Sequence, residues 1–179
     1  MPIGPNILNY PAPRIMEKIE KIKMNNCNRI SGLAEALFKG DQIKVAELLS
    51  GLAIGETIEV WDMILEVQAP NELELQLINR SKEERREYGL VVAGDTQEII
   101  EGKNDELNDR EVMGVAQRLS VNEGNRYFSH THWDEEGAPI PSGPDLTTFR
   151  TLKDVLGYDC RVVSWLPDNK VFVFRGEVK

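Results

Sequence analysis

The sequence has little of what marks several common classes of protein. Its 179 residues include only two cysteines, Cys27 and Cys160, which are far apart and match no C-x-x-C or zinc-knuckle spacing. Neither a disulfide framework nor a cysteine metal cluster is indicated, and we expect reduced thiols. No apolar run approaches the roughly 20 residues of a membrane-spanning helix, and the N-terminus lacks the basic and apolar regions of a signal peptide. We expect a cytoplasmic protein without membrane contact, or an effector secreted by a non-classical route.

Positive charge is also scarce. The chain has 21 Lys and Arg against 30 Asp and Glu, which gives a formal net charge of −9. Because proteins bind nucleic acid largely through basic side chains that neutralise phosphates, this balance argues against a nucleic-acid partner. With 41% hydrophobic and 28% charged residues, the composition is that of a globular protein with a buried core. A protein or peptide partner fits it better, and no pattern indicates an oligomeric state.

The first part of the chain carries mainly helical patterns. Apolar residues recur at helical spacing over 14–23, 31–40 and 42–49, whereas the apolar residues of 54–67 fit neither a strand nor a helix. We therefore predict a helical N-terminal extension or accessory domain over residues 1–70.

Residues 71–179 alternate between helical and strand patterns. Helices are predicted over 72–81, 111–119 and 144–156, and strands over 88–92, 98–100, 127–132, 160–165 and 170–174. In the first of these helices we expect Leu77 and Ile78 to face the core and Glu72, Glu74 and Gln76 to face solvent. The alternation predicts an α/β domain with a mixed central sheet and helices on both faces.

The only two histidines of the chain, His130 and His132, lie one residue apart on a predicted strand. Alternate side chains of a strand share a face, so both imidazoles project to the same side, together with Phe128. Two neutral imidazoles can bind one Zn²⁺ ion, and a catalytic zinc site adds a third protein ligand and leaves a position for water. Two polar residues on a solvated strand face are the alternative interpretation. Asp145, which opens the next helix, is the candidate third ligand.

Ser142 and Asp145 also have a purely structural interpretation. Their S-x-x-D spacing is close to a capping box, in which Ser142 accepts a hydrogen bond from the first turn and Asp145 faces the positive end of the helix dipole. Capping does not explain why this helix begins so soon after His130 and His132. The spacing therefore favours a metal role in addition to the cap.

Three motifs in this order resemble the JAB/MPN (JAMM) zinc metallopeptidase superfamily, whose signature is a strand glutamate, H-S/T-H and a downstream S-x-x-D. They are R-E-Y-G at 86–89, H-T-H at 130–132 and S-G-P-D at 142–145. Together with I-N-R-S at 78–81, the first motif looks like the divergent JAB-like domains of bacterial effectors and polymorphic toxins. The resemblance covers residues 71–179 and implies a deaminase-like α/β fold.

The resemblance also implies roles for single residues. His130, His132 and Asp145 would bind Zn²⁺. Glu87 would be the general base that takes a proton from the metal-bound water, and Ser142 would hydrogen-bond to the oxyanion. The implied activity is zinc-dependent hydrolysis of a peptide or isopeptide bond in a protein or peptide substrate, with a ubiquitin-like tail as one candidate.

Two features depart from the family pattern. Nine residues separate His132 from Ser142, more than in the common pattern, so we expect the loop to bulge or the ligand geometry to differ. Trp133 stands where many members have proline, and it can pack on the core or line a substrate groove. Glu84 competes with Glu87 as the base. Three loop carboxylates are alternatives to Asp145 as the oxygen ligand: Asp134, Glu135 and Glu136.

Two other functions remain open from the sequence. One is a JAB-like domain that has lost catalysis and serves as an MPN-type protein-binding module, against which the complete set of site residues argues. The other is a toxin or effector hydrolase with a different target, which the sequence around residues 78–89 favours by analogy.

Overall fold

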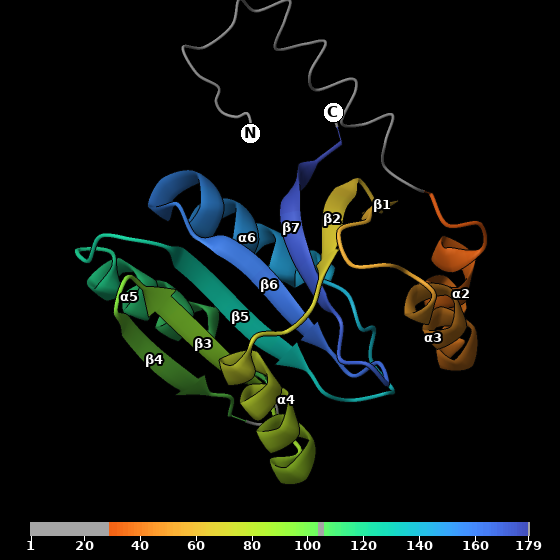
Figure 1. The fold of residues 1–179 in the computed structure, drawn as a ribbon, viewed down its shortest axis with the longest axis horizontal. Helices are drawn as coiled ribbons and strands as arrows, with labels where there is room; N and C mark the ends of the chain where they lie inside the picture. Colours follow the sequence, from red (N-terminus) through yellow and green to blue (C-terminus); the bar gives the residue numbers. More distant parts are fainter. Residues whose placement is uncertain (1–28, 104–105, 179) are drawn as a thin grey trace, which may run out of the picture.

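The computed structural model describes residues 29–103 and 106–178, which form one seven-stranded sheet covered by helices on both faces (Figure 1). The predicted α/β class with a mixed central sheet is therefore confirmed. The helical pattern at 14–23 and Cys27 lie outside the described residues. Within the described residues, no helix combines the length and the apolar character needed to cross a membrane.

The elements follow the predicted alternation closely after residue 71. The helices are α2 (Leu33–Lys39), α3 (Gln42–Ser50), α4 (Glu72–Glu84), α5 (Asp109–Leu119) and α6 (Gly143–Leu156). The strands are β1 (Thr57–Val60), β2 (Met63–Gln68), β3 (Tyr88–Ala93), β4 (Thr96–Glu101), β5 (Arg126–His132), β6 (Asp159–Ser164) and β7 (Val171–Glu177). Most predicted boundaries in this region differ from these by only a few residues, but α4 runs past the predicted end at Ser81.

The strand order is β1-β2-β7-β6-β5-β3-β4. All neighbouring strands are antiparallel except β5 and β6, which are parallel. A parallel pair needs a crossover connection, and α6 supplies it, because it lies between these two strands in the sequence. This crossover brings the start of α6 back to the end of β5.

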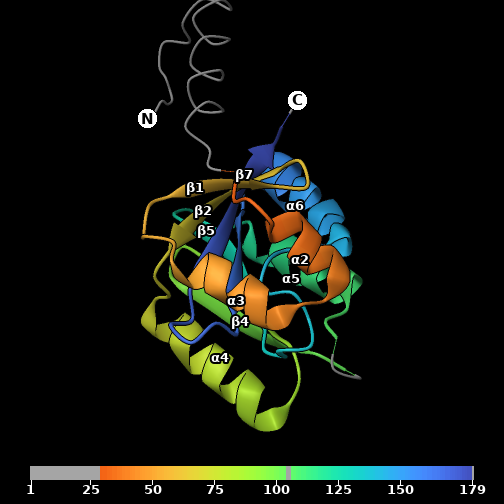
Figure 2. The same cartoon turned by 90° about the vertical axis from the view of Figure 1, so that its right-hand side faces the viewer.

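The two faces of the sheet pack against different helices, as Figures 1 and 2 show. Phe128 and Val162 belong to the main apolar cluster, which includes buried residues of α2, α3, α5 and α6. Their chain neighbours Tyr127 and Val163 point the other way, to smaller clusters under α4. This alternation is the strand periodicity expected of a sheet buried on both faces.

The segment with the ambiguous pattern forms the hairpin of β1 and β2. Trp61 and Asp62 make its two-residue turn with φ of 47° and 66°, the positive values that such tight turns require. Strand β2 then pairs with β7, so the hairpin extends the same sheet. The predicted helical extension over 1–70 is therefore wrong for this segment. Met63, Leu65 and Val67 do alternate into the core, but the apolar Ile64 between them obscures the pattern.

Glu74 corrects a second prediction. The sequence pattern predicts that it faces solvent from α4, but its side chain is 0% exposed. It forms an ion pair with Arg161 of β6, at 2.7 Å from Nε to Oε2, and accepts a hydrogen bond from the Ser129 hydroxyl. It also completes a capping box with Asn71. This polar cluster holds the start of α4 against the face of β5 opposite to the histidines.

Candidate metal centre

The pairing of β3 with β5 brings the first two motifs together. Gly89 lies opposite His130 in the antiparallel register, and Glu87 immediately precedes β3. This one strand pairing therefore brings Glu87 close to β5, the strand that carries the histidines, as expected.

His130 and His132 project from the same face of β5, as the strand period predicts. Their Nε2 atoms are 2.9 Å apart and their ring centroids 4.9 Å apart. His130 is 3% exposed and packs beside Phe128 and Phe149, whereas His132 is half-buried. The alternative of two histidines on a solvated face is therefore excluded.

Asp145 faces both histidines from the first turn of α6. Its Oδ1 lies 3.3 Å from Nε2 of His130, and its Oδ2 lies 3.2 Å from Nε2 of His132. The capping box is present as well, because the backbone N–H of Ser142 donates to Oδ2 at 2.7 Å and the Ser142 hydroxyl oxygen accepts from the Asp145 N–H. The cap orients the same carboxylate that faces the two imidazoles, so the two interpretations of the S-x-x-D motif hold together.

Three potential metal ligands thus meet at one point. Within the described residues, His130, His132 and Asp145 form a group whose ligand atoms all lie within 4.8 Å of one another. The loop carboxylates Asp134, Glu135 and Glu136 do not belong to it. The group is close enough to hold a metal ion.

The hydrogen bonding of His132 fits a metal ligand. Its Nδ1 lies 2.8 Å from the backbone oxygen of Ala138, which can only accept, so Nδ1 carries a proton. A neutral His132 then has its lone pair on Nε2, the atom that faces His130 and Asp145. A backbone carbonyl that fixes the tautomer in this way is typical of metal-binding histidines.

The site is electrostatically coupled. Burial alone would raise the pKa of Asp145, but the charge and hydrogen bonds of the two histidines outweigh it and hold that pKa well below its usual range. Burial likewise opposes the charged form of His132, yet the hydrogen bond and charge of Asp145, with a smaller contribution from Glu87, raise its pKa above the ordinary value. A divalent cation bound between these groups would take the place of the proton that His132 shares with Asp145.

Glu87 is held at the edge of the metal centre. Its Oε1 accepts a hydrogen bond from the Leu107 N–H at 3.1 Å, and its carboxylate lines the cavities on both sides of the site. The competing Glu84 is already engaged, with the Tyr88 hydroxyl at 2.5 Å and Arg80 at 2.8 Å. These hydrogen bonds lower the pKa of Glu84, so its carboxylate is less available to accept a proton.

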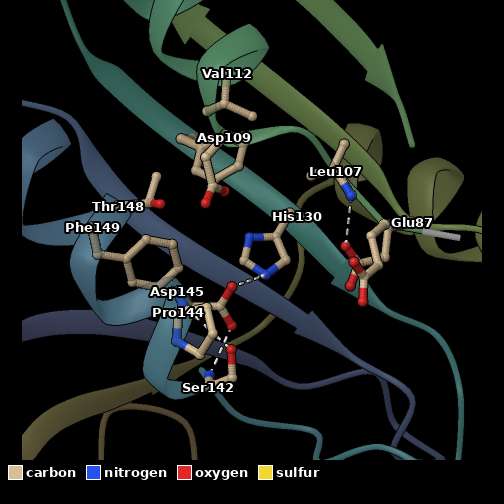
Figure 3. A pocket seen from close by; sticks show the side chains of 12 residues that line it. Glu87, Leu107, Asp109, Val112, His130, Ser142, Pro144, Asp145, Thr148 and Phe149 are labelled. Carbon is tan, nitrogen blue, oxygen red and sulfur yellow. Dashed lines mark hydrogen bonds and ion pairs between the residues drawn. The ribbon is translucent and has the colours of Figure 1, made fainter. Parts of the chain in front are cut away.

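Two cavities meet at the site. One, of about 220 Å³, lies between α5 and α6 beside His130 (Figure 3). The other is a more open groove of about 760 Å³, which passes His132 and Trp133. Glu87, Ser142 and Asp145 line both. Trp133 lines this groove and also packs against the smaller apolar cluster under α4.

The long loop between His132 and Ser142 folds back over the site. Three hydrogen bonds to its backbone oxygens hold it: from Gln42 of α3 to Glu136, from the Trp165 indole to Gly137, and from His132 to Ala138. The extra loop length is thus used to present a carbonyl to His132. Sequence reasoning missed both this contact and the Leu107 N–H, because backbone groups have no sequence signal.

Comparisons of the chain with protein-family models, with curated proteins and with solved structures found no match. The functional argument therefore depends on the geometry of the metal centre and on the motifs themselves.

Proposed function

We propose that the protein is a zinc-dependent metallohydrolase of the JAB/MPN type, with the deaminase-like fold of that superfamily, and that it cleaves a peptide or isopeptide bond. The observation that carries the proposal is the convergence of His130, His132 and Asp145 beside a groove. The carboxylate of Glu87 and the hydroxyl of Ser142 line the same groove. These are the residues that the motif resemblance assigns.

The donor set suits zinc. Two imidazole nitrogens and one carboxylate oxygen are a common three-ligand set for catalytic Zn²⁺, and the half-buried site opens on the groove. Zn²⁺ held there would lower the pKa of a coordinated water toward about 7 and so supply hydroxide at neutral pH.

The protein's own residues supply the proton transfers and the charge stabilisation. Glu87 accepts a proton from the attacking water and delivers it to the leaving amine, so that the amide C–N bond breaks without releasing a strong base. Ser142 already accepts the Asp145 N–H at its oxygen, which leaves the hydroxyl hydrogen to donate to the oxyanion of the tetrahedral intermediate. The Leu107 N–H fixes the orientation of the Glu87 carboxylate.

The groove supports a polypeptide substrate. It extends along the loop after β5 past Trp133 and Gly137, with a volume of about 760 Å³. Its lining is rich in carboxylates, including Glu84, Asp134 and Glu136, which would repel a nucleic-acid backbone. The extended C-terminal tail of a ubiquitin-like protein joined to a lysine is the candidate that the resemblance suggests.

Metal analysis tests the first half of the proposal. Protein saturated with zinc and then desalted is expected to retain stoichiometric zinc, and His132→Ala is expected to lose it, because one of three ligands is gone. Absence of zinc from the wild-type protein would refute the assignment.

Hydrolysis tests the second half. On ubiquitin-like proteins fused through their C-terminal tail to a lysine-containing peptide, Glu87→Gln is expected to reduce kcat by about 100- to 10,000-fold while zinc content is unchanged. Glu84→Gln is the matched control, because it removes a carboxylate from the same groove, and it should retain activity.

Zinc binding without cleavage would instead favour the binding module. Growth inhibition on expression that His132→Ala relieves, without amide cleavage, would favour a toxin with another target.

A further inference from the structure

The two histidines differ in the surroundings of their second ring nitrogen. Nδ1 of His132 is bonded to the Ala138 carbonyl. Nδ1 of His130 is buried and, within the described residues, has no hydrogen-bond partner. Buried polar atoms of native proteins nearly always have a partner, so this atom needs an explanation.

Nδ1 of His130 faces the cavity of about 220 Å³. Figure 3 shows this atom on the side of the ring away from Asp145, toward the part of the cavity where Asp109 and Thr148 lie. The volume corresponds to roughly seven water molecules at liquid density, and the lining offers several polar groups. Nδ1 itself has less than 1 Å² of accessible surface, so a water in this cavity reaches it only after a small shift of the His130 ring or of its neighbours.

Metal binding would make Nδ1 a hydrogen-bond donor. When Nε2 of a neutral imidazole gives its lone pair to a metal, the ring proton must be on Nδ1. Metal-binding histidines usually donate this proton to a carboxylate, a carbonyl or a water, which fixes the ring and makes Nε2 a better ligand. His132 has such an acceptor in Ala138, and His130 requires one in the cavity.

Besides the proposed ligand Asp145, three carboxylates line this cavity: Glu87, Glu106 and Asp109. Glu87 accepts the Leu107 N–H and is the proposed general base. Glu106 lies in the loop before α5. Asp109 is the first residue of α5, directly after the Asn108 cap, so a helix fixes its backbone, and its carboxylate points toward His130 in Figure 3.

We propose that Asp109 is a positioning residue of the metal centre, which accepts the Nδ1 proton of His130 through a water molecule in the cavity. This inference rests on the proposed function. The two metal-binding histidines are then oriented by different partners, His132 by a backbone carbonyl and His130 by a carboxylate from another helix. Helix α5 thereby becomes part of the zinc site without touching the ion.

The test compares Asp109→Ala with Glu111→Ala. Both variants remove one exposed carboxylate from the first turn of α5, so they affect the helix dipole alike, but Glu111 does not line the cavity. In competition with a chromophoric chelator, Asp109→Ala is expected to weaken zinc affinity about 10- to 100-fold, and Glu111→Ala less than about twofold.

A second measurement separates positioning from a general structural defect. In ¹⁵N-labelled, zinc-loaded protein, the Nδ1–H resonances of the two histidines are compared. In Asp109→Ala the His130 proton should exchange faster with solvent or shift, while the His132 proton, bonded to Ala138, serves as internal reference and stays unchanged.

Equal zinc affinities of the two variants, or a His130 resonance indifferent to Asp109, would overturn this inference and leave the zinc site standing. Wild-type protein that binds no zinc would overturn both. Parallel changes at His130 and His132 in Asp109→Ala would show that α5 supports the fold only, which also contradicts the inference.

Discussion

Removal of the Glu74 carboxylate is expected to destabilise the protein severely. Glu74 is 0% exposed, and the guanidinium of Arg161 binds it through two nitrogens, at 2.7 Å and 2.9 Å. The Asn71 N–H donates to Oε1 at 3.0 Å, and the Ser129 hydroxyl donates to Oε2. In Glu74→Ala all four contacts are lost at once and a largely buried cation is left without its counter-ion.

The magnitude follows from this loss. Breaking a buried ion pair by removing one partner costs about 3–5 kcal/mol. Arg161 keeps one hydrogen bond, to Gln68 at 2.7 Å, which limits the cost to this range. At roughly 2–4 °C per kcal/mol for a chain of this size, the Tm should fall by about 6–20 °C.

Urea and thermal unfolding, followed by circular dichroism, measure the effect. Glu72→Ala is the matched control, because Glu72 lies exposed in the same first turn of α4, and it should change the free energy of unfolding by less than about 1 kcal/mol. Glu74→Met combined with Arg161→Met should recover much of the loss, since an apolar pair leaves no buried charge. Equal effects of Glu74→Ala and Glu72→Ala would refute the reasoning.

Two further predictions concern pH and the backbone. In metal-free protein, the raised pKa of His132 stabilises the fold below about pH 6.5, and the lowered pKa of Asp145 stabilises it above about pH 4. In the presence of chelator, the free energy of unfolding should therefore decline as the pH rises from 6 to 9. A flat profile would contradict this coupling. Saturating zinc should remove that decline, because protons compete with the metal. Gly94→Ala should lower the free energy of unfolding in urea by more than about 1 kcal/mol, since the φ of Gly94 is +60° and a Cβ would lie 2.1 Å from the backbone oxygen of Glu123. Gly114→Ala, at an open helical position, should instead stabilise the protein by about 0.5–1 kcal/mol. Similar values for both variants would show that the contact at Gly94 is absent.

Local signals predicted most elements of this fold. Gly157 ends α6 in the left-handed conformation, as glycine at a helix end indicates. Gly94 and Asp95 turn β3 into β4 as the hairpin signal suggests. The β1–β2 hairpin was not predicted because its turn, Trp61-Asp62, lacks the glycine of the Asn-Gly or Asp-Gly pair that signals such a hairpin.

The burial of polar residues was not predictable from the pattern. Glu74 alternates with leucines on α4 in the same way as the exposed Glu72 and Gln76, and only the guanidinium of Arg161, 87 residues away in sequence, makes its burial favourable. Glu84 and Glu87 look alike in sequence, yet Tyr88 and Arg80 engage the first and the Leu107 N–H the second. Glu84 is engaged by side chains four residues before and after it, whereas Glu87 is held by a backbone group 20 residues away.

The sequence by itself determined the local half of the candidate site. The two-residue period of a strand puts His130 and His132 on one face, and the capping spacing puts Asp145 in the first turn of α6. Only the tertiary structure decided that Asp145 meets the two histidines. The parallel pairing of β5 with β6 requires α6 to cross the sheet, and its first turn then lies beside the histidines. The Ala138 carbonyl and the cavity beside His130 are likewise products of long-range packing, which no local pattern encodes.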